Sequence, residues 1–412
     1  MTETDAPTLM DQITDEAARA NPWPLFEQLR ETPVARQPDG TYVVSGYAEI
    51  VALLHDPRVS SDPTKRADGG MTGGRIEPAF INTDPPEHDT LRRETTSFFG
   101  PPHRPDMVAK LEPWMHETVN RLIDGFADRE QIDVVDDFAY PFPVSAICRI
   151  LGVPPEDEPK FHDWSGALIV ALGLRMHPEG HQAEFQAALK ANQEMTDYLG
   201  ALAEAHAKDP GDDILSGLAT DKSPDAMNME SIKSTARLLL IAGHETTVNL
   251  ISNGALTLLR HPEHIERVRN EPEYVIRLVE ELLRFEPPVQ MIPNRTALED
   301  IAVGETTIPA GAPITLVHAA GNRDPHRFAD PATFDPDRQD GIEGQHLGLG
   351  GGVHYCFGAP LARLEVQIAL RTLFRRLDNP RLVQDPPPYR PSPILRGPVH
   401  LPIAMDGVLP AW

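Results

Sequence analysis

The chain has 412 residues, of which 40% are hydrophobic and 24% charged, proportions typical of a globular protein. Its formal net charge of −25 argues against nucleic acid as a partner, because phosphate binding needs a basic surface. No stretch has the length and apolarity of a membrane span. The acidic N-terminus also lacks the basic and apolar regions of a signal peptide, so we expect a cytoplasmic protein.

The first half of the chain predicts a flexible start followed mainly by helices. We expect residues 1–20 to be flexible and residues 21–412 to form a single domain. TYVVS at residues 41–45 alternates as a strand does. Residues 61–80 contain four glycines and no helical period, which indicates a long binding or lid loop. Helical periodicity predicts helices at 22–29, 48–55, 88–99, 107–128, 143–152, 156–173 and 180–207.

The second half predicts one very long helix and several small sheets. Residues 228–261 would span roughly 50 Å as a single helix. Its centre, ARLLLIAGHETTVNLIS, is apolar on most sides and therefore belongs in a core. After Pro287, short β-rich runs broken by Gly and Pro indicate small sheets, and residues 324–346 predict an irregular loop. Further helices are predicted at 262–270, 272–285 and 360–377.

The chain has two cysteines, too few for a disulfide framework. Cys148 sits in the apolar run VSAICRILGV and is most simply a buried small hydrophobic residue. Cys356 lies between a run of glycines and a helix that begins near Pro360. A glycine-rich loop lets the backbone approach a flat ligand closely, and a helix N-terminus favours a thiolate.

A thiolate at residue 356 has several chemical uses. It could act as a nucleophile, because His354 is two residues away. A structural cysteine at a helix cap is a second interpretation. Zinc needs further cysteine and histidine ligands at set spacings, which the sequence lacks. Haem iron needs a single protein ligand and fits the glycine-rich loop best.

The middle of the long helix, AGHETT at residues 242–247, is unusual for a core helix. A buried glutamate is costly unless it is paired, and glycine lowers helix propensity. A threonine hydroxyl can bond back to a carbonyl and bend the helix. Together Gly243, Glu245 and Thr246 indicate a small polar pocket suited to proton delivery. A Glu245 that is salt-bridged inside the fold is the alternative.

Two more segments are unspecific when taken singly. Glu281 and Arg284 share a helix face, where a surface ion pair is the default interpretation. FDPDR at residues 334–338 is a rigid loop whose final Arg338 could dock on such a pair. The occurrence of all four segments in this order is, by contrast, specific.

With these four segments the chain resembles the cytochrome P450 family, of the soluble bacterial, ferredoxin-dependent type. LGLGGGVHYCFG is similar to the family's haem-binding loop, AGHETT to its oxygen-activation motif, and ELLR with FDPDR to its Glu-x-x-Arg pair and the loop that locks onto it. The resemblance covers about residues 20–405. It implies the P450 fold, mainly α with small β-sheets, in which haem b is sandwiched between the long central helix and the Cys356 loop.

The resemblance also implies residue roles. Cys356 would ligate the iron, and its thiolate would favour O–O cleavage. Glu245 and Thr246 match the acid–alcohol pair that relays protons to oxygen. The residues implied to hold the haem loop in place are Glu281, Arg284 and Arg338. Those implied to contact the haem propionates, which need charged donors, are His88, Arg92, Arg295 and His354.

The chain departs from the family pattern at two loop positions. The family usually has Phe seven residues before the cysteine, where this chain has Leu349. The loss of aromatic shielding could change the iron potential or the rigidity of the loop. Gly351 stands where a larger residue is common, which predicts a more flexible loop.

By the same resemblance, the substrate pocket draws on the loop at 65–82, the region 165–185 and eight further residues. These positions are mostly apolar, so we expect a largely hydrophobic substrate such as a terpenoid, steroid, fatty acid, macrolide or aromatic compound. The eight residues are Leu238, Ile241, Ala242, Val289, Met291, Ile292, Ile394 and Leu395.

The chain carries no flavin or iron–sulfur module, so its electrons must come from other proteins. The resemblance implies a ferredoxin and its reductase, O2 as co-substrate, and a monomer. Arg93, Arg104 and Arg363 would form a local basic patch for the ferredoxin on the cysteine side of the haem.

Four functions compete. The leading one is an O2-dependent monooxygenase that hydroxylates or epoxidises a small molecule in specialised metabolism or catabolism. Glu245 and Thr246 are both present, which counts against a peroxide-driven peroxygenase and against a haem-binding sensor or carrier without turnover. A cysteine hydrolase using Cys356 and His354 would explain neither the Glu245–Thr246 pair nor the residues that match the propionate contacts.

Overall fold

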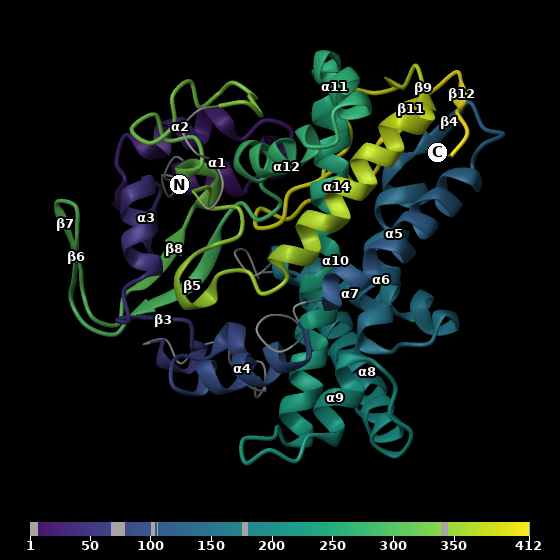
Figure 1. Ribbon diagram of the computed structural model, residues 1–412. Helices are drawn as coiled ribbons and strands as arrows, with labels where there is room; N and C mark the ends of the chain where they lie inside the picture. The colour runs from purple at the N-terminus through teal and green to yellow at the C-terminus, as the bar shows by residue number, and fades with distance from the viewer. Residues whose placement is uncertain are drawn as a thin grey trace.

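The longest element is α10, Met229–Arg260, which runs through the middle of the molecule (Figure 1). The computed structural model describes residues 7–66, 79–99, 104, 106–174, 180–338 and 345–411. The side chain of Asn228 caps α10 by accepting a hydrogen bond from the N–H of Ser231 at 2.9 Å. From Val248 to Leu258 every residue of α10 is buried, because other helices cover it on all sides.

Helices α6, α8 and α14 pack directly on α10 and enclose the main hydrophobic core. The helices other than α10 are α1 (Leu9–Thr14), α2 (Trp23–Arg30), α3 (Tyr47–Leu54), α4 (Glu87–Phe99), α5 (Met107–Asp124), α6 (Pro141–Leu151), α7 (Glu158–Leu174), α8 (Gln182–Lys208), α9 (Ile214–Thr220), α11 (Ile265–Asn270), α12 (Tyr274–Phe285), α13 (His318–Gly321) and α14 (Ala359–Arg376). Among the described residues, no helix combines the length and apolarity needed to cross a membrane.

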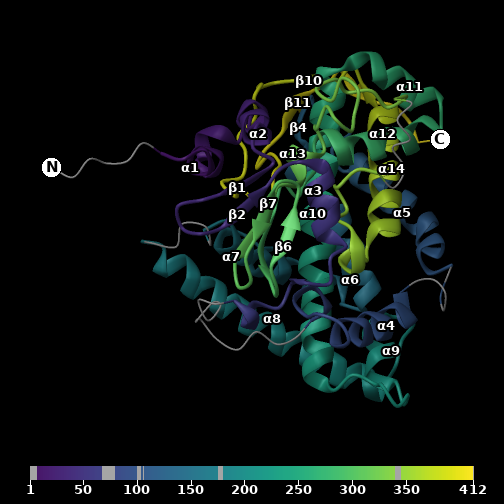
Figure 2. The ribbon, with the colours of Figure 1, turned by 90° about the vertical axis from the view of Figure 1, so that its left-hand side faces the viewer.

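Small sheets supply the remaining regular structure. The largest has the strand order β1-β2-β8-β5-β3, in which only β2 and β8 run parallel. This sheet and the β6–β7 hairpin lie to one side of α10, as Figures 1 and 2 show from two directions. The strands are β1 (Val34–Arg36), β2 (Tyr42–Val44), β3 (Val59–Ser60), β4 (Gln131–Asp133), β5 (Ile292–Ala297), β6 (Ile301–Val303), β7 (Thr306–Ile308), β8 (Pro313–Leu316), β9 (Leu377–Asp378), β10 (Arg381–Leu382), β11 (Pro402–Ala404) and β12 (Gly407–Val408).

An irregularity in β5 has a bearing on function. Its register against β8 shifts between Ile292 and Arg295, and Asn294 between them has a φ of 67°. An irregularity of this kind bends a strand locally and re-aims its side chains. Ile292 and Arg295 consequently both face the internal cavity described below.

The predicted fold class, mainly α with small β-sheets, is confirmed. Within residues 1–20, which the sequence predicted to be flexible, the structure places a short capped helix. Residues 9–14 form α1, which begins with a reciprocal cap. The hydroxyl of Thr8 accepts a hydrogen bond from the N–H of Asp11, and the N–H of Thr8 donates to the Asp11 carboxylate. Met10 and Ile13 are buried against Phe26, and this apolar contact holds the helix in place. Of the predicted loop at 61–80, residues 67–78 lie outside the described residues.

Candidate active site

The loop that carries Cys356 is shaped by close backbone contacts. Gly348 lies against the carbonyl of Leu283, which would be 2.3 Å from an added Cβ. Gly352 has a φ of +61°, and a Cβ there would come within 1.9 Å of the Leu54 carbonyl oxygen. Only glycine fits these two positions. The loop then closes on itself, because the N–H of Cys356 donates to the carbonyl of Leu349 at 2.9 Å.

Cys356 lies at the wall of an internal cavity, just before α14. Burial raises the pKa of its thiol, while the backbone N–H groups of Gly358 and Ala359 and the charge of Arg92 act in the opposite direction. Donors of this kind stabilise a thiolate. Burial is the larger effect, so the net shift of the Cys356 pKa is upward. The other cysteine, Cys148, is fully buried in the main core, as predicted.

Aromatic packing secures the residue after the cysteine. The ring of Phe357 stacks on Phe99 at 4.7 Å and lies 5.5 Å from Phe80. Leu349, which replaces the aromatic residue usual in the family, is buried and also lines the cavity. The loop is therefore anchored from its Phe357 side, and aliphatic packing replaces aromatic shielding at Leu349.

The cavity has a volume of about 1540 Å³ and extends between the Cys356 loop and the central helix α10. Six of the eight predicted pocket residues line it: Leu238, Ile241, Ala242, Val289, Ile292 and Ile394. Leu168 and Phe185 from the predicted 165–185 region and Phe80 from the predicted 65–82 loop do so as well.

The prediction is wrong for Met291 and Leu395. Both are buried in a separate apolar cluster that includes Phe26 and Ile13, and neither belongs to the cavity lining. Each directly adjoins a residue that does line the cavity, Ile292 and Ile394 respectively. Successive side chains of an extended segment point to opposite faces, so one of each pair turns into the core.

Three of the four residues predicted to contact the propionates gather at one side of the cavity. Arg92, Arg295 and His354 line it, and Arg92 Nη2 donates to the carbonyl of Tyr355 at 2.8 Å. His88 does not line the cavity but stands behind His354, with its ring 4.6 Å away and at 69°. Burial, followed by the charges of Arg295 and His88, lowers the pKa of His354 to about 3.

His318 was not predicted and joins this set. It lines the cavity, and burial together with Arg295 lowers its pKa to about 4. Within the described part of the chain, His88 Nε2, His318 Nε2 and His354 Nδ1 are buried without a hydrogen-bond partner. Carboxylates at this side of the cavity would satisfy these nitrogens and stabilise the buried Arg295. These side chains therefore fit the two propionates of the haem that the resemblance implies.

The AGHETT segment presents two different faces of α10. Ala242 and Thr246 line the cavity, and the Thr246 hydroxyl donates to the Ala242 carbonyl at 3.0 Å. Gly243 lets α6 approach, because a Cβ there would lie 2.9 Å from Ile147 Cδ1. Of the three residues of the predicted polar pocket, Gly243 and Thr246 line the cavity and Glu245 does not.

Glu245 does not line the cavity. Its carboxylate oxygens lie 3.7 Å from His244 Nε2 and 3.7 Å from Arg390 Nη2. Oε2 is buried and has no hydrogen-bond partner among the described residues. The predicted acid and alcohol are thus neighbours in sequence whose side chains point to different faces in this conformation.

Glu365 of α14 is a site residue that the sequence interpretation missed. It lines the cavity at 1% exposure, and both of its carboxylate oxygens lack a hydrogen-bond partner in the described part of the chain. Burial raises its pKa well above the ordinary value, with Thr247 acting against this. Burial therefore favours the neutral form of this side chain. A single Glu in an amphipathic helix gives no sequence signal of such a role.

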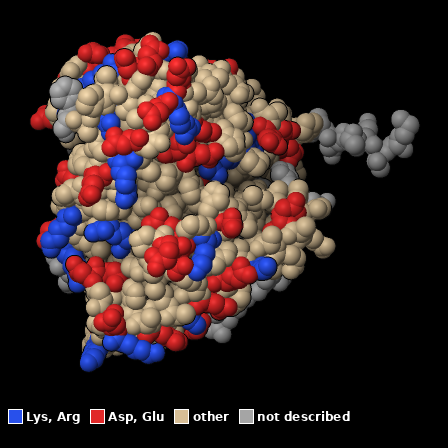
Figure 3. Space-filling view, turned by 90° about the vertical axis from the view of Figure 1, so that its right-hand side faces the viewer, with Lys and Arg blue, Asp and Glu red and all other residues tan. Residues whose placement is uncertain are grey.

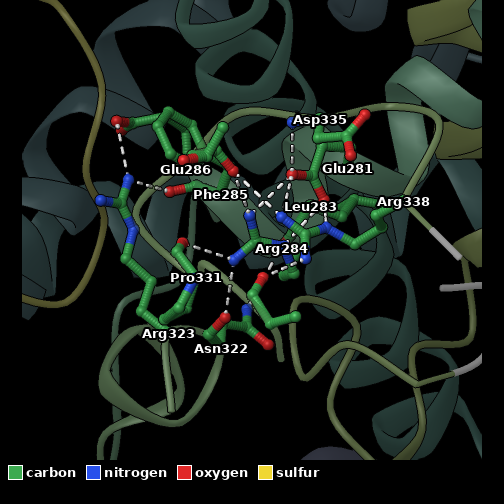
Figure 4. Close-up of polar contacts among 12 residues, drawn as sticks. Glu281, Leu283, Arg284, Phe285, Glu286, Asn322, Arg323, Pro331, Asp335 and Arg338 are labelled. Atoms are coloured by element: carbon green, nitrogen blue, oxygen red, sulfur yellow. Dashed lines mark hydrogen bonds and ion pairs between the residues drawn. The ribbon is translucent and has the colours of Figure 1, made fainter. Parts of the chain in front are cut away.

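The three predicted structural residues form one buried network (Figure 4). Arg284 donates to both Glu281 oxygens, at 2.7 and 2.6 Å, and Arg338 donates to Glu281 at 3.1 Å. The N–H of Asp335 donates to Glu281 at 3.0 Å. Arg284 also donates to the carbonyls of Asn322 at 3.0 Å and Pro331 at 2.9 Å. The surface-pair alternative is excluded, because Glu281 and Arg284 are fully buried.

A bridge of two amide contacts connects this network to the cysteine loop. Asn322 Nδ2 donates to the Leu283 carbonyl at 3.2 Å, and Asn322 Oδ1 accepts from the N–H of Leu347 at 2.6 Å. The neighbouring Glu280 binds Arg363 at 2.6 and 2.9 Å and His346 at 3.1 Å. Burial opposes the ionisation of Glu280, but these two partners outweigh it and lower its pKa to about 2.

The predicted basic patch is neutralised. Arg93 pairs with Asp225 at 2.9 Å, and Arg104 pairs with Asp212 at 2.8 Å. Arg363 is occupied by Glu280. On the face drawn in Figure 3, acidic side chains are spread between the basic ones.

A cysteine on a glycine-rich loop, a long helix with a threonine across the cavity, and a buried Glu-x-x-Arg network are the features that the resemblance to the P450 family led us to expect. The chain belongs to the cytochrome P450 family, whose model matches residues 33–401. It is therefore a haem-containing monooxygenase of the bacterial type, an oxidoreductase that incorporates oxygen from O2 into small molecules and receives electrons from redox partners.

Relatives cover nearly the whole chain. It is 33% identical to 6-deoxyerythronolide B hydroxylase of Saccharopolyspora erythraea over 97% of this chain and 100% of that protein. It is 36% identical to cytochrome P450 monooxygenase PikC of Streptomyces venezuelae over 93% of this chain and 91% of that protein. The crystal structure of Mycobacterium smegmatis CYP164A2 matches with a TM-score of 0.89 at 38% identity, covering 97% of this chain and 100% of that one.

Proposed function

We propose that Cys356 is the axial ligand of a haem b and that the cavity above it oxidises a largely hydrophobic small molecule. One observation carries this proposal: Cys356 and Thr246 line the same cavity from the cysteine loop and from α10, and Arg92, Arg295 and His354 line one side of it. When bound, the haem supplies the redox chemistry that activates O2. The protein supplies the thiolate, the propionate partners and a walled space.

The propionates would be held by Arg92, Arg295 and His354, which line the cavity, with His318 as a fourth donor. His88 would act through His354, on whose ring it packs. Apolar side chains make up most of the wall around the substrate region. They exclude water from the reacting centre, which limits wasteful release of reduced oxygen.

Proton supply is assigned to the AGHETT segment. The Thr246 Oγ1 faces the cavity and can donate a hydrogen bond into it once it leaves the Ala242 carbonyl. Glu245 Oε2, which has no hydrogen-bond partner among the described residues, can carry a proton when the side chain changes rotamer toward the cavity. The peroxide-driven alternative is not favoured by the comparisons, whose named relatives include monooxygenases and hydroxylases.

Several finer points remain proposals. We expect a ferredoxin and its reductase as electron donors, a monomer, and a cytoplasmic location. Relatives include proteins acting on macrolides and a structure, CYP267B1, in complex with myristic acid, which supports a hydrophobic substrate for this chain.

Turnover under O2 enriched in the heavy oxygen isotope tests the function. A panel of candidate substrates is incubated with the enzyme, a ferredoxin, its reductase and reduced nicotinamide cofactor. The masses of the products are then measured by mass spectrometry. We expect one labelled oxygen atom per product molecule. Product oxygen that carries no label and therefore comes from water, or an enzyme that works with peroxide and not with O2, would overturn the proposal.

A further inference from the structure

A buried histidine of α10 has no role in the site described so far. His244 is 1% exposed and directly precedes Glu245 in the AGHETT segment. Its Nε2 lies 3.7 Å from Glu245 Oε1. Neither His244 Nε2 nor Glu245 Oε2 has a hydrogen-bond partner among the described residues. Buried polar atoms without partners are rare in folded proteins, so this pair calls for a physical explanation.

The other ring nitrogen fixes the tautomer of His244. Nδ1 lies 2.7 Å from the carbonyl oxygen of Leu240, which can only accept, so Nδ1 carries a hydrogen and donates it. In the neutral ring Nε2 therefore has a free lone pair. Burial lowers the pKa of His244, with the charge of Glu245 acting in the opposite direction. An acceptor nitrogen thus stands next to a carboxylate, and their contact becomes favourable when one proton lies between them.

A cation and two aromatic rings connect this pair to the surface. Arg390 Nη2 lies 3.7 Å from Glu245 Oε2, and the Arg390 side chain is 18% exposed. The ring of Tyr140, directly before α6, packs edge-on 6.1 Å from that of His244. The same ring packs 4.6 Å from His162 of α7, which is exposed. His244 thus faces Glu245 on its own helix, and it faces Arg390, Tyr140 and His162 on the elements packed against it.

We propose that His244 is the site at which Glu245 is reloaded with a proton between turnovers. This rests on the proposed function, in which Glu245 carries protons toward the cavity by a change of rotamer. While the carboxylate is turned to the cavity, His244 Nε2 is uncovered and takes a proton from water. When the carboxylate returns, it meets the protonated Nε2 and removes that proton.

The two proton transfers balance at each atom. In the first, an O–H bond of a hydronium ion breaks and an N–H bond forms at Nε2, which makes the ring of His244 a cation. In the second, that N–H bond breaks and an O–H bond forms on Glu245, so the ring is neutral again. Burial makes the cationic ring a stronger acid, which favours the second transfer. Nδ1 keeps its hydrogen throughout, so the cycle needs no change of tautomer.

Arg390 favours the return of the carboxylate. Its Nε donates to Asn249 Oδ1 at 3.2 Å, which holds the guanidinium beside Glu245. Opposite charges attract more strongly where water is excluded, so Arg390 stabilises the rotamer in which Glu245 lies next to His244. His244 and Arg390 both act on the reaction through Glu245, and they are therefore positioning residues.

Replacement of His244 by Asn separates proton supply from structure. The amide of Asn keeps an N–H donor for the Leu240 carbonyl but has no nitrogen that takes up a proton. We expect the yield of oxygenated product per reduced cofactor to fall about tenfold, because water can still protonate Glu245 directly at a lower rate. In the wild type the yield should fall as the pH rises and protonation of Nε2 becomes slower. The variant should lose this dependence.

Two comparisons show whether the effect passes through Glu245. In a Glu245→Gln background, His244→Asn should cause no further loss, because the carboxylate that His244 reloads is gone. His206→Asn is the matched control, since His206 Nδ1 bonds to Asp213 at 3.0 Å and the residue does not line the cavity. The control should leave the yield and its pH profile unchanged.

NMR spectroscopy of the haem-loaded protein, with histidine rings labelled with the heavy nitrogen isotope, tests the proposal without turnover. The signals of His244 are assigned by their shift in Glu245→Gln. We expect hydrogen on Nδ1 and none on Nε2 at neutral pH, and uptake of a proton on Nε2 as the pH falls. A ring protonated on Nε2 and bare on Nδ1 would overturn the proposal, and this result decides even if His244→Asn fails to fold.

The yields separate this proposal from the function on which it rests. Equal yields in the wild type and His244→Asn, or a further tenfold loss in the Glu245→Gln background, would refute the role of His244 and leave the monooxygenase function intact. A wild-type protein that incorporates no labelled oxygen would instead overturn the proposed function, and the reloading step with it.

Discussion

Replacing Glu281 by Gln tests the buried network that supports the cysteine loop. The change keeps the shape of the side chain but leaves the fully buried guanidinium of Arg284 without its carboxylate. Removal of one partner from a buried ion pair costs about 3–5 kcal/mol. Arg284 keeps carbonyl acceptors at Asn322, Pro331 and Thr333, so we expect the lower end, about 3 kcal/mol. For 412 residues this lowers the unfolding temperature by about 3–4 °C.

The assay is thermal unfolding of the haem-loaded protein, followed by far-ultraviolet circular dichroism and by haem absorbance. Glu266→Gln is the matched control, because that carboxylate is 73% exposed and lies 3.8 Å from Arg269. It should change stability by less than about 0.5 kcal/mol. In Glu281→Gln we expect haem absorbance to be lost before the helices unfold. Equal temperature shifts in the two variants, or haem loss that coincides with unfolding in Glu281→Gln, would show that the network does not support the loop.

Three further predictions concern the site. Thr246→Ala should lower the yield of oxygenated product per reduced cofactor about a hundredfold, and an unchanged yield would remove the hydroxyl from the proton path. Gly352→Ala should abolish haem incorporation, judged by the ratio of haem to protein absorbance, because its Cβ would collide with the Leu54 carbonyl at 1.9 Å. The pKa of Glu280 is lowered from 4.5 to about 2, so its stabilisation is complete above pH 4.5 and is lost as the pH falls toward 2. The gap in unfolding temperature between wild type and Glu280→Gln should close over that interval. A gap that is constant with pH would contradict this.

The elements that sequence could locate are those with a local signature. The length and apolarity of α10 required a core helix, and three glycines before Cys356 required a loop in close contact with other backbone. Helix α1 was missed although its cap signal, Thr8 followed by Asp11, is present, because the segment is short and terminal.

The parts that could not be predicted depend on where each side chain points in the folded protein, which residues distant in the sequence determine. Whether Met291 or Ile292 faces the cavity is set by strand register, and a one-residue difference changes the face. Glu245 is buried 3.7 Å from Arg390, a residue far away in the sequence, and no local pattern indicates that contact. Glu365 is an ordinary residue of an amphipathic helix, and only the packing of α14 beside the cavity makes it part of the site.

The absorption spectrum of the dithionite-reduced protein under carbon monoxide tests thiolate ligation by Cys356 most directly. We predict a strongly red-shifted Soret band in the wild type and its loss in Cys356→His, with Cys148→Ser unchanged because that cysteine is buried in the main core. An ordinary carbonyl-haem band in the wild type, or no haem band in well-folded protein after reconstitution, would contradict the assignment of Cys356 as the iron ligand.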